Sequence, residues 1–203
     1  MAWRLKSVLT SPFIFGSLQW LVGAPRCHQL VLAKYVQPKS GDRLLDIGCG
    51  VGITLPHLPK DVSYTGVDIS AAYIKAARAR FGERGSFICS DVAHVKVELG
   101  HFDHAIAIGV LHHLDNETAH SLLRLARSAL RPGARLVTLD PCYTPEQSPL
   151  ARFIINRDRG EFVRDVEGYR RLFEGYGSAE IAVLHHMLRI PYTHALAIVR
   201  FSS

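Results

Sequence analysis

A glycine-rich turn is the first feature of the sequence that could bind a ligand. The segment LLDIGCGVG (44–52) predicts an apolar strand that runs into a turn whose glycines let the backbone approach a ligand closely. A P-loop would need a lysine followed by serine or threonine after the last glycine, but Ile53 and Thr54 stand there. A dinucleotide-binding turn would need a glycine in place of Ile53. The turn alone leaves two interpretations, an ordinary tight turn and a site for another kind of nucleotide.

Three aspartates lie at the ends of successive predicted strands. Asp46 precedes the glycine turn, Asp68 closes the next strand, and Asp91 follows the third. Ligands of open α/β sheets bind at the carboxyl ends of strands, where Asp68 can accept hydrogen bonds from ribose hydroxyls. Asp91 can accept one from an adenine amine while Val92 covers the ring. Each aspartate alone would be a turn or cap residue. Together they suit a nucleoside with a cationic tail, which excludes pyrophosphate and favours S-adenosylmethionine.

Alternating apolar runs and helical patterns predict the elements that carry these residues. We expect a short helix after Gly52, a helix over Ala71–Phe81 capped by Ser70 and closed by Gly82, and a helix that Asp115 or Asn116 caps and Arg131-Pro132-Gly133 ends. The predicted strands are Arg43–Ile47, Tyr64–Asp68, Ser86–Cys89, His104–Ile108, Leu136–Leu139, Ala179–His185 and His194–Phe201.

Strand–helix alternation implies a parallel sheet with right-handed crossovers. The last two strands are separated only by a turn-like segment, which suits an antiparallel hairpin. We therefore predict an α/β, Rossmann-like, doubly wound seven-stranded sheet, mostly parallel with an antiparallel C-terminal hairpin. Residues 1–203 form a single domain in this prediction, with an N-terminal helical lid (1–40) and a second lid segment after the fifth strand (141–177).

These motifs together resemble class I S-adenosylmethionine-dependent methyltransferases. LLDIGCGVG, YTGVDIS, the SDV after the third strand, IAIGVLHHLD and LRPGARLVTLD carry the resemblance over about residues 40 to 140. Ala134 departs from the pattern, because the family often has a second glycine there. The resemblance implies that Asp46, Gly48, Cys49 and Gly50 line the methionine end of the cofactor, Asp68 and Ile69 hold ribose and adenine, Asp91 and Val92 hold the adenine edge, and Ile108 and Gly109 place carbonyls near the amino group.

The pair His112-His113 follows the fourth strand, where a methyl donor and an acceptor would meet. Methyl transfer from a sulfonium needs mainly orientation and exclusion of water, and a base helps when the acceptor must lose a proton. Histidine titrates near neutral pH. We select His113 as the catalytic candidate and His112 as the second choice. The alternative is that one ring packs against the cofactor loop and the other bonds backbone.

Acceptor-binding candidates follow the fifth strand. Asp140 and Tyr143 lie where this fold gathers such groups, and Arg157 and Arg159 belong to a polar run in an otherwise apolar segment. An arginine there would clamp a carboxylate or phosphate, whereas a solvated helix end with ion pairs is the alternative. The pairs His101/His104 and His185/His186 have no third ligand at a recognisable spacing, so we expect no metal.

The predicted function is transfer of a methyl group from S-adenosylmethionine to an O, N or C nucleophile of a small molecule, which leaves S-adenosylhomocysteine. GVLHHLD stands where amino-methylating nucleic-acid enzymes of this fold carry an Asn-Pro-Pro-Tyr-type tetrapeptide. The net charge of +6 gives weak support to a nucleic-acid partner, because the basic residues are scattered. Two alternatives stay open: a methyltransferase acting on RNA or protein, and a cofactor-binding protein without catalysis.

Cellular location follows from the cysteines and the N-terminus. Four cysteines without a CxxC pair predict a reducing cytoplasm. The apolar stretch Val8–Ala24 is interrupted by Pro12 and is too short to span a bilayer, so we expect a mature helix. Its large apolar side chains suit an apolar acceptor, core packing or contact with a membrane surface. These side chains are Phe13, Phe15, Trp20 and Leu21.

Overall fold

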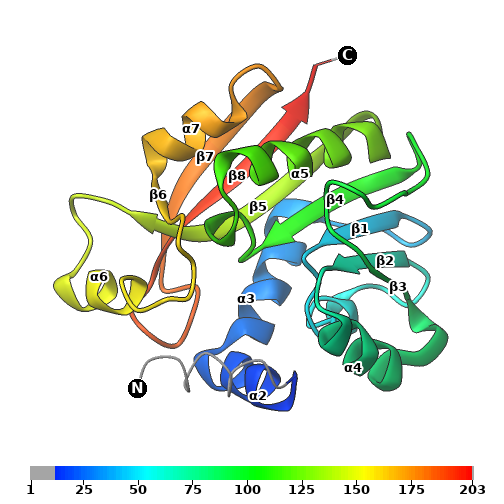
Figure 1. Ribbon diagram of the computed structural model, residues 1–203, viewed down its shortest axis with the longest axis horizontal. Helices are drawn as coiled ribbons and strands as arrows, with labels where there is room; N and C mark the ends of the chain where they lie inside the picture. Colours follow the sequence, from blue (N-terminus) through cyan, green and yellow to red (C-terminus); the bar gives the residue numbers. More distant parts are fainter. Residues whose placement is uncertain (1–11, 203) are drawn as a thin grey trace.

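The computed structural model describes residues 12–202, and side chains from residue 16 onward. A mixed sheet with the order β3-β2-β1-β4-β5-β8-β7 forms its centre (Figure 1). Strands β1 to β5 are parallel, and β8 pairs antiparallel with both β5 and β7. The strands are β1 Arg43–Ile47, β2 Ser63–Asp68, β3 Ser86–Cys89, β4 Phe102–Ile108, β5 Leu130–Tyr143, β6 Arg164–Asp165, β7 Gly177–His185 and β8 Thr193–Phe201.

The doubly wound sheet with an antiparallel C-terminal hairpin is confirmed, and the short strand β6 is an addition that pairs with β5. The longer helices are α2 Pro12–Val22, α3 Ala24–Val31, α4 Ala71–Phe81, α5 Asn116–Ala129, α6 Pro149–Ile155 and α7 Val166–Phe173. A π-helical turn, Leu32–Val36, extends α3, and 3₁₀ turns cover Leu55–His57, Gly82–Arg84 and Leu111–His113.

Local capping chemistry sets the helix boundaries as predicted. The Ser70 hydroxyl accepts a hydrogen bond from the Tyr73 N–H at 3.3 Å, and α4 begins at the next residue. Asp115 caps α5 by accepting from the Thr118 N–H at 2.8 Å. Gly82 ends α4 with a positive φ of 54°. These caps fix where each helix starts or stops relative to the strand ends.

Two predicted elements differ from the structure. The expected helix after Gly52 consists of turns and the three-residue 3₁₀ segment Leu55–His57. Pro56 lacks an N–H and Pro59 follows closely, so an α-helix cannot continue there. Strand β5 is longer than the predicted Leu136–Leu139, because α5 ends at Ala129 and pairing with β4 resumes at Leu130.

Both faces of the sheet are covered by apolar helices. Residues of α5 and α7, including Leu122 and Phe173, pack with Leu45 and Ile47 on one face. Residues of α3 and α4, including Val31 and Ile74, form the core on the other face. Burial on both faces leaves the strand ends and their loops as the places where polar side chains can gather.

The N-terminal helix predicted from the apolar stretch is present as α2 and turns into α3 at Gly23, whose φ is 90°. Trp20 and Leu21 are each 64% exposed, so the core-packing interpretation is wrong for these two residues. The side chains of Phe13 and Phe15, and residues 8–11, lie outside the described residues. Within residues 12–202, no helix combines the length and apolar character needed to cross a membrane.

Candidate active site

Asp68 and the glycine turn form one hydrogen-bonded unit at the carboxyl ends of β1 and β2. The Gly50 N–H donates to Asp68 Oδ2 at 2.9 Å, and the Ser70 N–H donates to Oδ1 at 2.8 Å. Burial raises the pKa of Asp68, while these two hydrogen bonds oppose that shift. A carboxylate has about four acceptor positions, so Asp68 keeps acceptor capacity for hydroxyl donors.

Asp46 is a buried carboxylate beneath the same turn. Its side chain accepts a hydrogen bond from the Tyr64 hydroxyl at 2.7 Å. Burial raises the pKa of Asp46 to about 6, with a smaller contribution from the charge of Asp68, although hydrogen bonds from Tyr64 and Thr54 oppose the shift. A cation above the turn would favour the ionised form of both aspartates. This charge arrangement fits a ligand with a positive tail.

The glycines around the turn serve packing between protein groups. A Cβ at Gly48, whose φ is 78°, would collide with the side chain of Val110. One at Gly52 would lie 2.8 Å from the Phe81 ring, and one at Gly66 would lie 2.7 Å from the Cys49 sulfur. Packing against Val110 and Phe81 therefore requires glycine at positions 48 and 52, and the approach of this turn to a ligand stays a prediction. The Cys49 side chain is buried toward Gly66, while its N–H donates to the Val67 carbonyl and its carbonyl accepts from the Gly52 N–H, both at 3.0 Å.

The remaining predicted cofactor residues lie at the neighbouring strand ends. Ile69 is 70% exposed, an unusual exposure for a large apolar side chain directly after a strand. Asp91 Oδ1 accepts from the Ala93 N–H at 2.7 Å in a tight turn, and Val92 is half-buried. Ile108 ends β4, and the Gly109 N–H donates to the Leu139 carbonyl at 2.7 Å.

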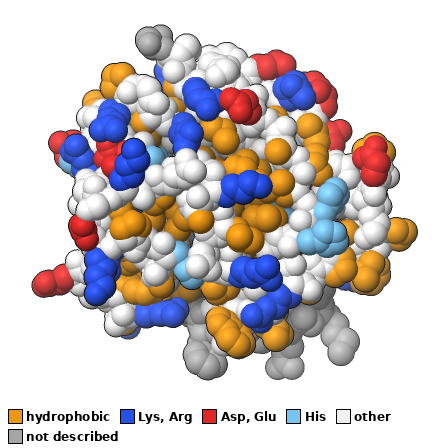
Figure 2. Space-filling model, turned by 180° about the vertical axis from the view of Figure 1, so that it is seen from behind, with side chains coloured by type: hydrophobic (Ala, Val, Ile, Leu, Met, Phe, Trp, Pro, Cys, Tyr) orange, Lys and Arg blue, Asp and Glu red, His pale blue; other side chains and the backbone are white. Residues whose placement is uncertain are grey.

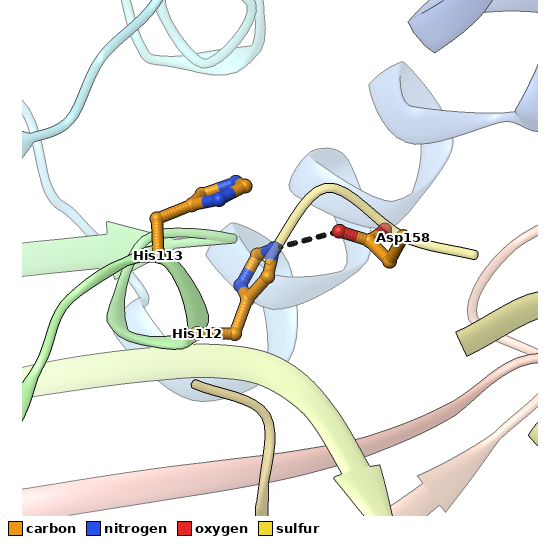
Figure 3. Close-up of side chains that lie close together, drawn as sticks. All are labelled: His112, His113 and Asp158. Atoms are coloured by element: carbon orange, nitrogen blue, oxygen red, sulfur yellow. Dashed lines mark ion pairs between the residues drawn. The ribbon is translucent and has the colours of Figure 1, made fainter. Parts of the chain in front are cut away.

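His112 is buried and held between two carboxylates. Its Nδ1 lies 3.0 Å from Asp140 Oδ1. Its Nε2 lies 3.3 Å from Asp158 Oδ1, the ion pair drawn in Figure 3. Burial alone would lower the pKa of His112, but hydrogen bonds and charges of Asp140 and Asp158 outweigh it and raise the pKa to about 9. Asp140 is 1% exposed and also accepts from the His112 N–H. The prediction that Asp140 contacts the acceptor is therefore wrong, because it lies behind His112.

His113 is the exposed member of the pair. Its ring centroid lies 4.0 Å from that of His112, with the ring planes tilted by 40°. Desolvation, followed by the positive charge of His112, lowers the pKa of His113 to about 4. The two adjacent histidines therefore diverge in environment, and the neutral, exposed ring is His113.

Residues 158–164, which we call the strap, hold the turn that carries both histidines. The Phe162 N–H donates to the His112 carbonyl at 2.9 Å. The Arg164 guanidinium donates to the carbonyls of Leu111 at 2.8 Å and Leu114 at 2.9 Å. A Cβ at Gly160 would lie 2.7 Å from the His112 carbonyl oxygen, so only glycine allows this approach.

The residues predicted to bind the acceptor after β5, Tyr143, Arg157 and Arg159, make different contacts. Arg157 stacks over the Phe153 ring at 3.6 Å, and both Arg157 and Arg159 are exposed. The Tyr143 hydroxyl donates to Asn156 Oδ1 at 2.8 Å. Of these three predicted residues, Arg159 lies near enough to the histidine cluster for its charge to contribute to the lowered pKa of His113.

Asp158, which lies between the two arginines in sequence, is instead the residue that reaches the cluster, and the sequence prediction missed it. Its Oδ2 accepts from the Tyr192 hydroxyl at 2.8 Å. The density of polar residues at 156–160 was the only sequence signal for this position.

The other histidine pairs have structural partners. His104 Nε2 lies 2.9 Å from Asp42 Oδ2, and His101 Nδ1 lies 2.9 Å from Glu98 Oε2. His185 Nδ1 lies 3.3 Å from the Thr193 hydroxyl. Among the described residues, neither pair gathers the three ligands that a metal site would require.

Known proteins share this arrangement of elements and motifs. A family model described as a methyltransferase domain matches residues 45–136. An O-methyltransferase of Penicillium expansum is 34% identical over 131 residues, which cover 58% of this chain and 46% of that protein. The 27-O-demethylrifamycin SV methyltransferase of Amycolatopsis mediterranei is 32% identical over 126 residues, covering 59% of this chain and 46% of that protein. Residues 45–136 thus match a methyltransferase domain, and the chain is similar to S-adenosylmethionine-dependent methyltransferases.

The chain spans about half the length of the curated relatives it matches. Among solved structures, phosphoethanolamine N-methyltransferase 2 of Haemonchus contortus has a TM-score of 0.73 at 14% identity, over 94% of this chain and 57% of that chain. The mitomycin 7-O-methyltransferase has a TM-score of 0.71 at 20% identity, over 93% and 56%. These two similarities establish the methyltransferase fold.

Proposed function

We propose that this protein transfers a methyl group from S-adenosylmethionine to a nucleophilic O, N or C atom of a small molecule. The observation that carries the proposal is the pairing of two desolvated carboxylates, Asp46 and Asp68, with a histidine cluster one strand away. The carboxylates suit a cationic nucleoside, and the histidines suit a nucleophile that must lose a proton. The whole chain, residues 1–203, would act as one domain in the cytoplasm.

In this proposal the residues at the strand ends hold the cofactor, which supplies a methyl group activated by its sulfonium. Asp68 accepts hydrogen bonds from the ribose hydroxyls, and the exposed Ile69 covers the adenine. Asp91 and Val92 contact the adenine edge. The ionised Asp46 stabilises the positive charge above the turn. The backbones of Gly48, Cys49, Gly50, Ile108 and Gly109 complete the cradle.

His113 meets the acceptor in this proposal, because it is the exposed member of the pair. His112, Asp140 and Asp158 position it from behind. Tyr143, Arg157 and Arg159 then lie farther out, where they would contact a larger or anionic acceptor.

A small acceptor is favoured over a macromolecule. Two of the proteins named above, the 27-O-demethylrifamycin SV and mitomycin 7-O-methyltransferases, act on small molecules by their names. On the face drawn in Figure 2, basic side chains are dispersed among apolar and uncharged groups, whereas nucleic-acid binding needs clustered positive charge. The exposed Trp20 and Leu21 favour an apolar acceptor or contact with a membrane surface.

The proposal is tested by cofactor binding and by the fate of the methyl group. Isothermal titration with S-adenosylmethionine should give one site, and Asp68→Ala should weaken it at least tenfold, while Asp61→Ala, an exposed acid on the surface, should not. A lysate is fractionated by size, and the fractions are incubated with the protein and methyl-labelled cofactor. A labelled product should then form in the small-molecule fraction. Label confined to RNA or protein would refute the small-acceptor assignment, and normal binding by Asp68→Ala would refute the ribose assignment.

A further inference from the structure

His112, His113 and Asp158 form a set of metal-ligand atoms. One nitrogen of each ring and one oxygen of the carboxylate all lie within 4.8 Å of one another. His112 and His113 come from the turn after β4, and Asp158 comes from the strap, so the set joins segments far apart in sequence (Figure 3). Two imidazoles and a carboxylate are ligands that zinc and other divalent transition metals take in proteins.

The spacing of His112 and Asp158 suits two ligands of one ion. The distance of 3.3 Å between His112 Nε2 and Asp158 Oδ1 is longer than the roughly 2.7–2.9 Å of a charge-assisted hydrogen bond. Two ligands bound to zinc at about 2.0–2.1 Å in tetrahedral geometry are separated by about 3.3–3.4 Å. In the absence of an ion the two groups form an ion pair, and their separation also suits two ligands of one metal ion.

Supporting groups hold these ligands in the orientation that a metal requires. Asp140, 1% exposed, lies 3.0 Å from His112 Nδ1 and would keep a proton there when a metal ion displaces the proton from Nε2. Asp158 Oδ2 is held by the Tyr192 hydroxyl at 2.8 Å, and Oδ1 accepts from the Gly160 N–H at 2.9 Å. The second oxygen of Asp140 is buried without a hydrogen-bond partner among the described residues, as expected for a group whose charge acts through His112.

We propose that His112, His113 and Asp158 bind one divalent transition-metal ion, with Asp140 as the positioning residue for His112. Three protein ligands leave a coordination position open to a further oxygen ligand. In the cation-loaded protein, that ligand would be the acceptor, which must then carry a hydroxyl or another metal-binding oxygen.

The role of the ion toward the acceptor rests on the proposed function. A hydroxyl bound to the ion ionises more easily, and its proton leaves to solvent. His113 would then serve as a ligand, and no protein base would be needed.

The binding experiment uses the metal-free full chain titrated with Zn²⁺ by calorimetry and with Co²⁺ by visible absorption. We expect one ion per chain and a Co²⁺ spectrum typical of four or five ligands. Asp158→Asn and His113→Ala should abolish the spectrum, and Asp140→Asn should weaken Zn²⁺ binding by about 10- to 100-fold. His94→Ala removes a histidine that is exposed and should leave both signals unchanged.

The controls separate loss of folding from loss of the site. Circular dichroism of each variant checks the fold, and His113→Ala removes an exposed ring, so it tests the site even if Asp158→Asn does not fold. Zn²⁺ binding by folded His113→Ala equal to that of the wild type would overturn the proposal, as would the absence of one-to-one binding by the wild type. Methyl transfer that persists with a chelator, without any ion bound, would overturn the metal site and leave the proposed function intact. Ion binding without cofactor binding would overturn the proposed function and leave the metal site intact.

Discussion

Replacing Asp46 with asparagine removes a buried charge from beneath the glycine turn. The amide oxygen can still accept the hydrogen bond that the Tyr64 hydroxyl donates at 2.7 Å. Burial raises the pKa of Asp46 to about 6 from an ordinary value of 3.8. A difference of about two pKa units corresponds to about 3 kcal/mol between the two protonation states. At neutral pH the ionised Asp46 therefore destabilises the unliganded wild-type protein by about this amount.

The direction of the pH effect follows from proton binding. Because folding raises the pKa of Asp46, the folded chain binds more protons than the unfolded chain between the two pKa values. The stability that Asp46 contributes at low pH is lost as the pH rises through about 6. Asp46→Asn should thus raise the free energy of unfolding at pH 7.5 by up to about 3 kcal/mol, and this advantage should shrink by about 2 kcal/mol at pH 4.5.

Urea unfolding of both proteins without ligand, followed by far-ultraviolet circular dichroism at the two pH values, measures this difference. Comparing variant with wild type at each pH cancels the titration of all other groups. Calorimetry at pH 7.5 should show weaker S-adenosylmethionine binding by the variant, since the charge opposite the sulfonium is gone. A variant less stable than wild type at pH 7.5, or an advantage that does not depend on pH, would refute the assignment of Asp46 as a desolvated carboxylate.

Two substitutions test the strap. Gly160→Ala should lower the free energy of unfolding by about 1–3 kcal/mol, because its Cβ would lie 2.7 Å from the His112 carbonyl oxygen. The control is Gly16→Ala, whose Cβ would meet its nearest neighbour at 3.9 Å. Equal effects of the two substitutions in urea unfolding would contradict the packing argument. Arg164→Lys should lower the free energy of unfolding by about 1–3 kcal/mol, because hydrogen bonds to two backbone carbonyls are lost. Replacement of the exposed Arg171 by lysine should change it by less than about 0.5 kcal/mol. Thermal unfolding that ranks the two variants the other way would contradict the role of Arg164 in holding the histidine turn.

Most of the elements around the predicted cofactor site, from β1 to β4, could be predicted from the sequence because their signals are local. The strand Arg43–Ile47 and the helix Ala71–Phe81 are bounded by glycine, serine and aspartate caps that act over a few residues. The short helix expected after Gly52 failed because Pro56 and Pro59 limit that segment to turns. The use of Gly48 also escaped prediction, since the side chain of Val110 that excludes a Cβ there comes from another loop.

The surroundings of His112 and His113 could be predicted only in part. His112 and His113 were identified from their place after β4, but no local pattern shows that one is buried between carboxylates and the other is exposed. Asp140 was predicted as a substrate contact because it follows β5, and its direction toward His112 is set by tertiary packing. Asp158 is 46 residues from His112 along the chain, by their positions in the sequence. Such long-range contacts leave no periodic signal.

The segment that the family model matches ends before most of the groups around the histidines. The family model matches residues 45–136, whereas Asp140, Asp158 and Tyr192 all follow that segment. The matched segment thus contains the predicted donor site, and most of the groups that surround the two histidines lie outside it. Because binding groups at the reacting atom decide specificity, the names of the relatives support a small acceptor but do not predict which molecule it is. The strap and Tyr192 are where substitutions should change the choice of acceptor without weakening the cofactor site.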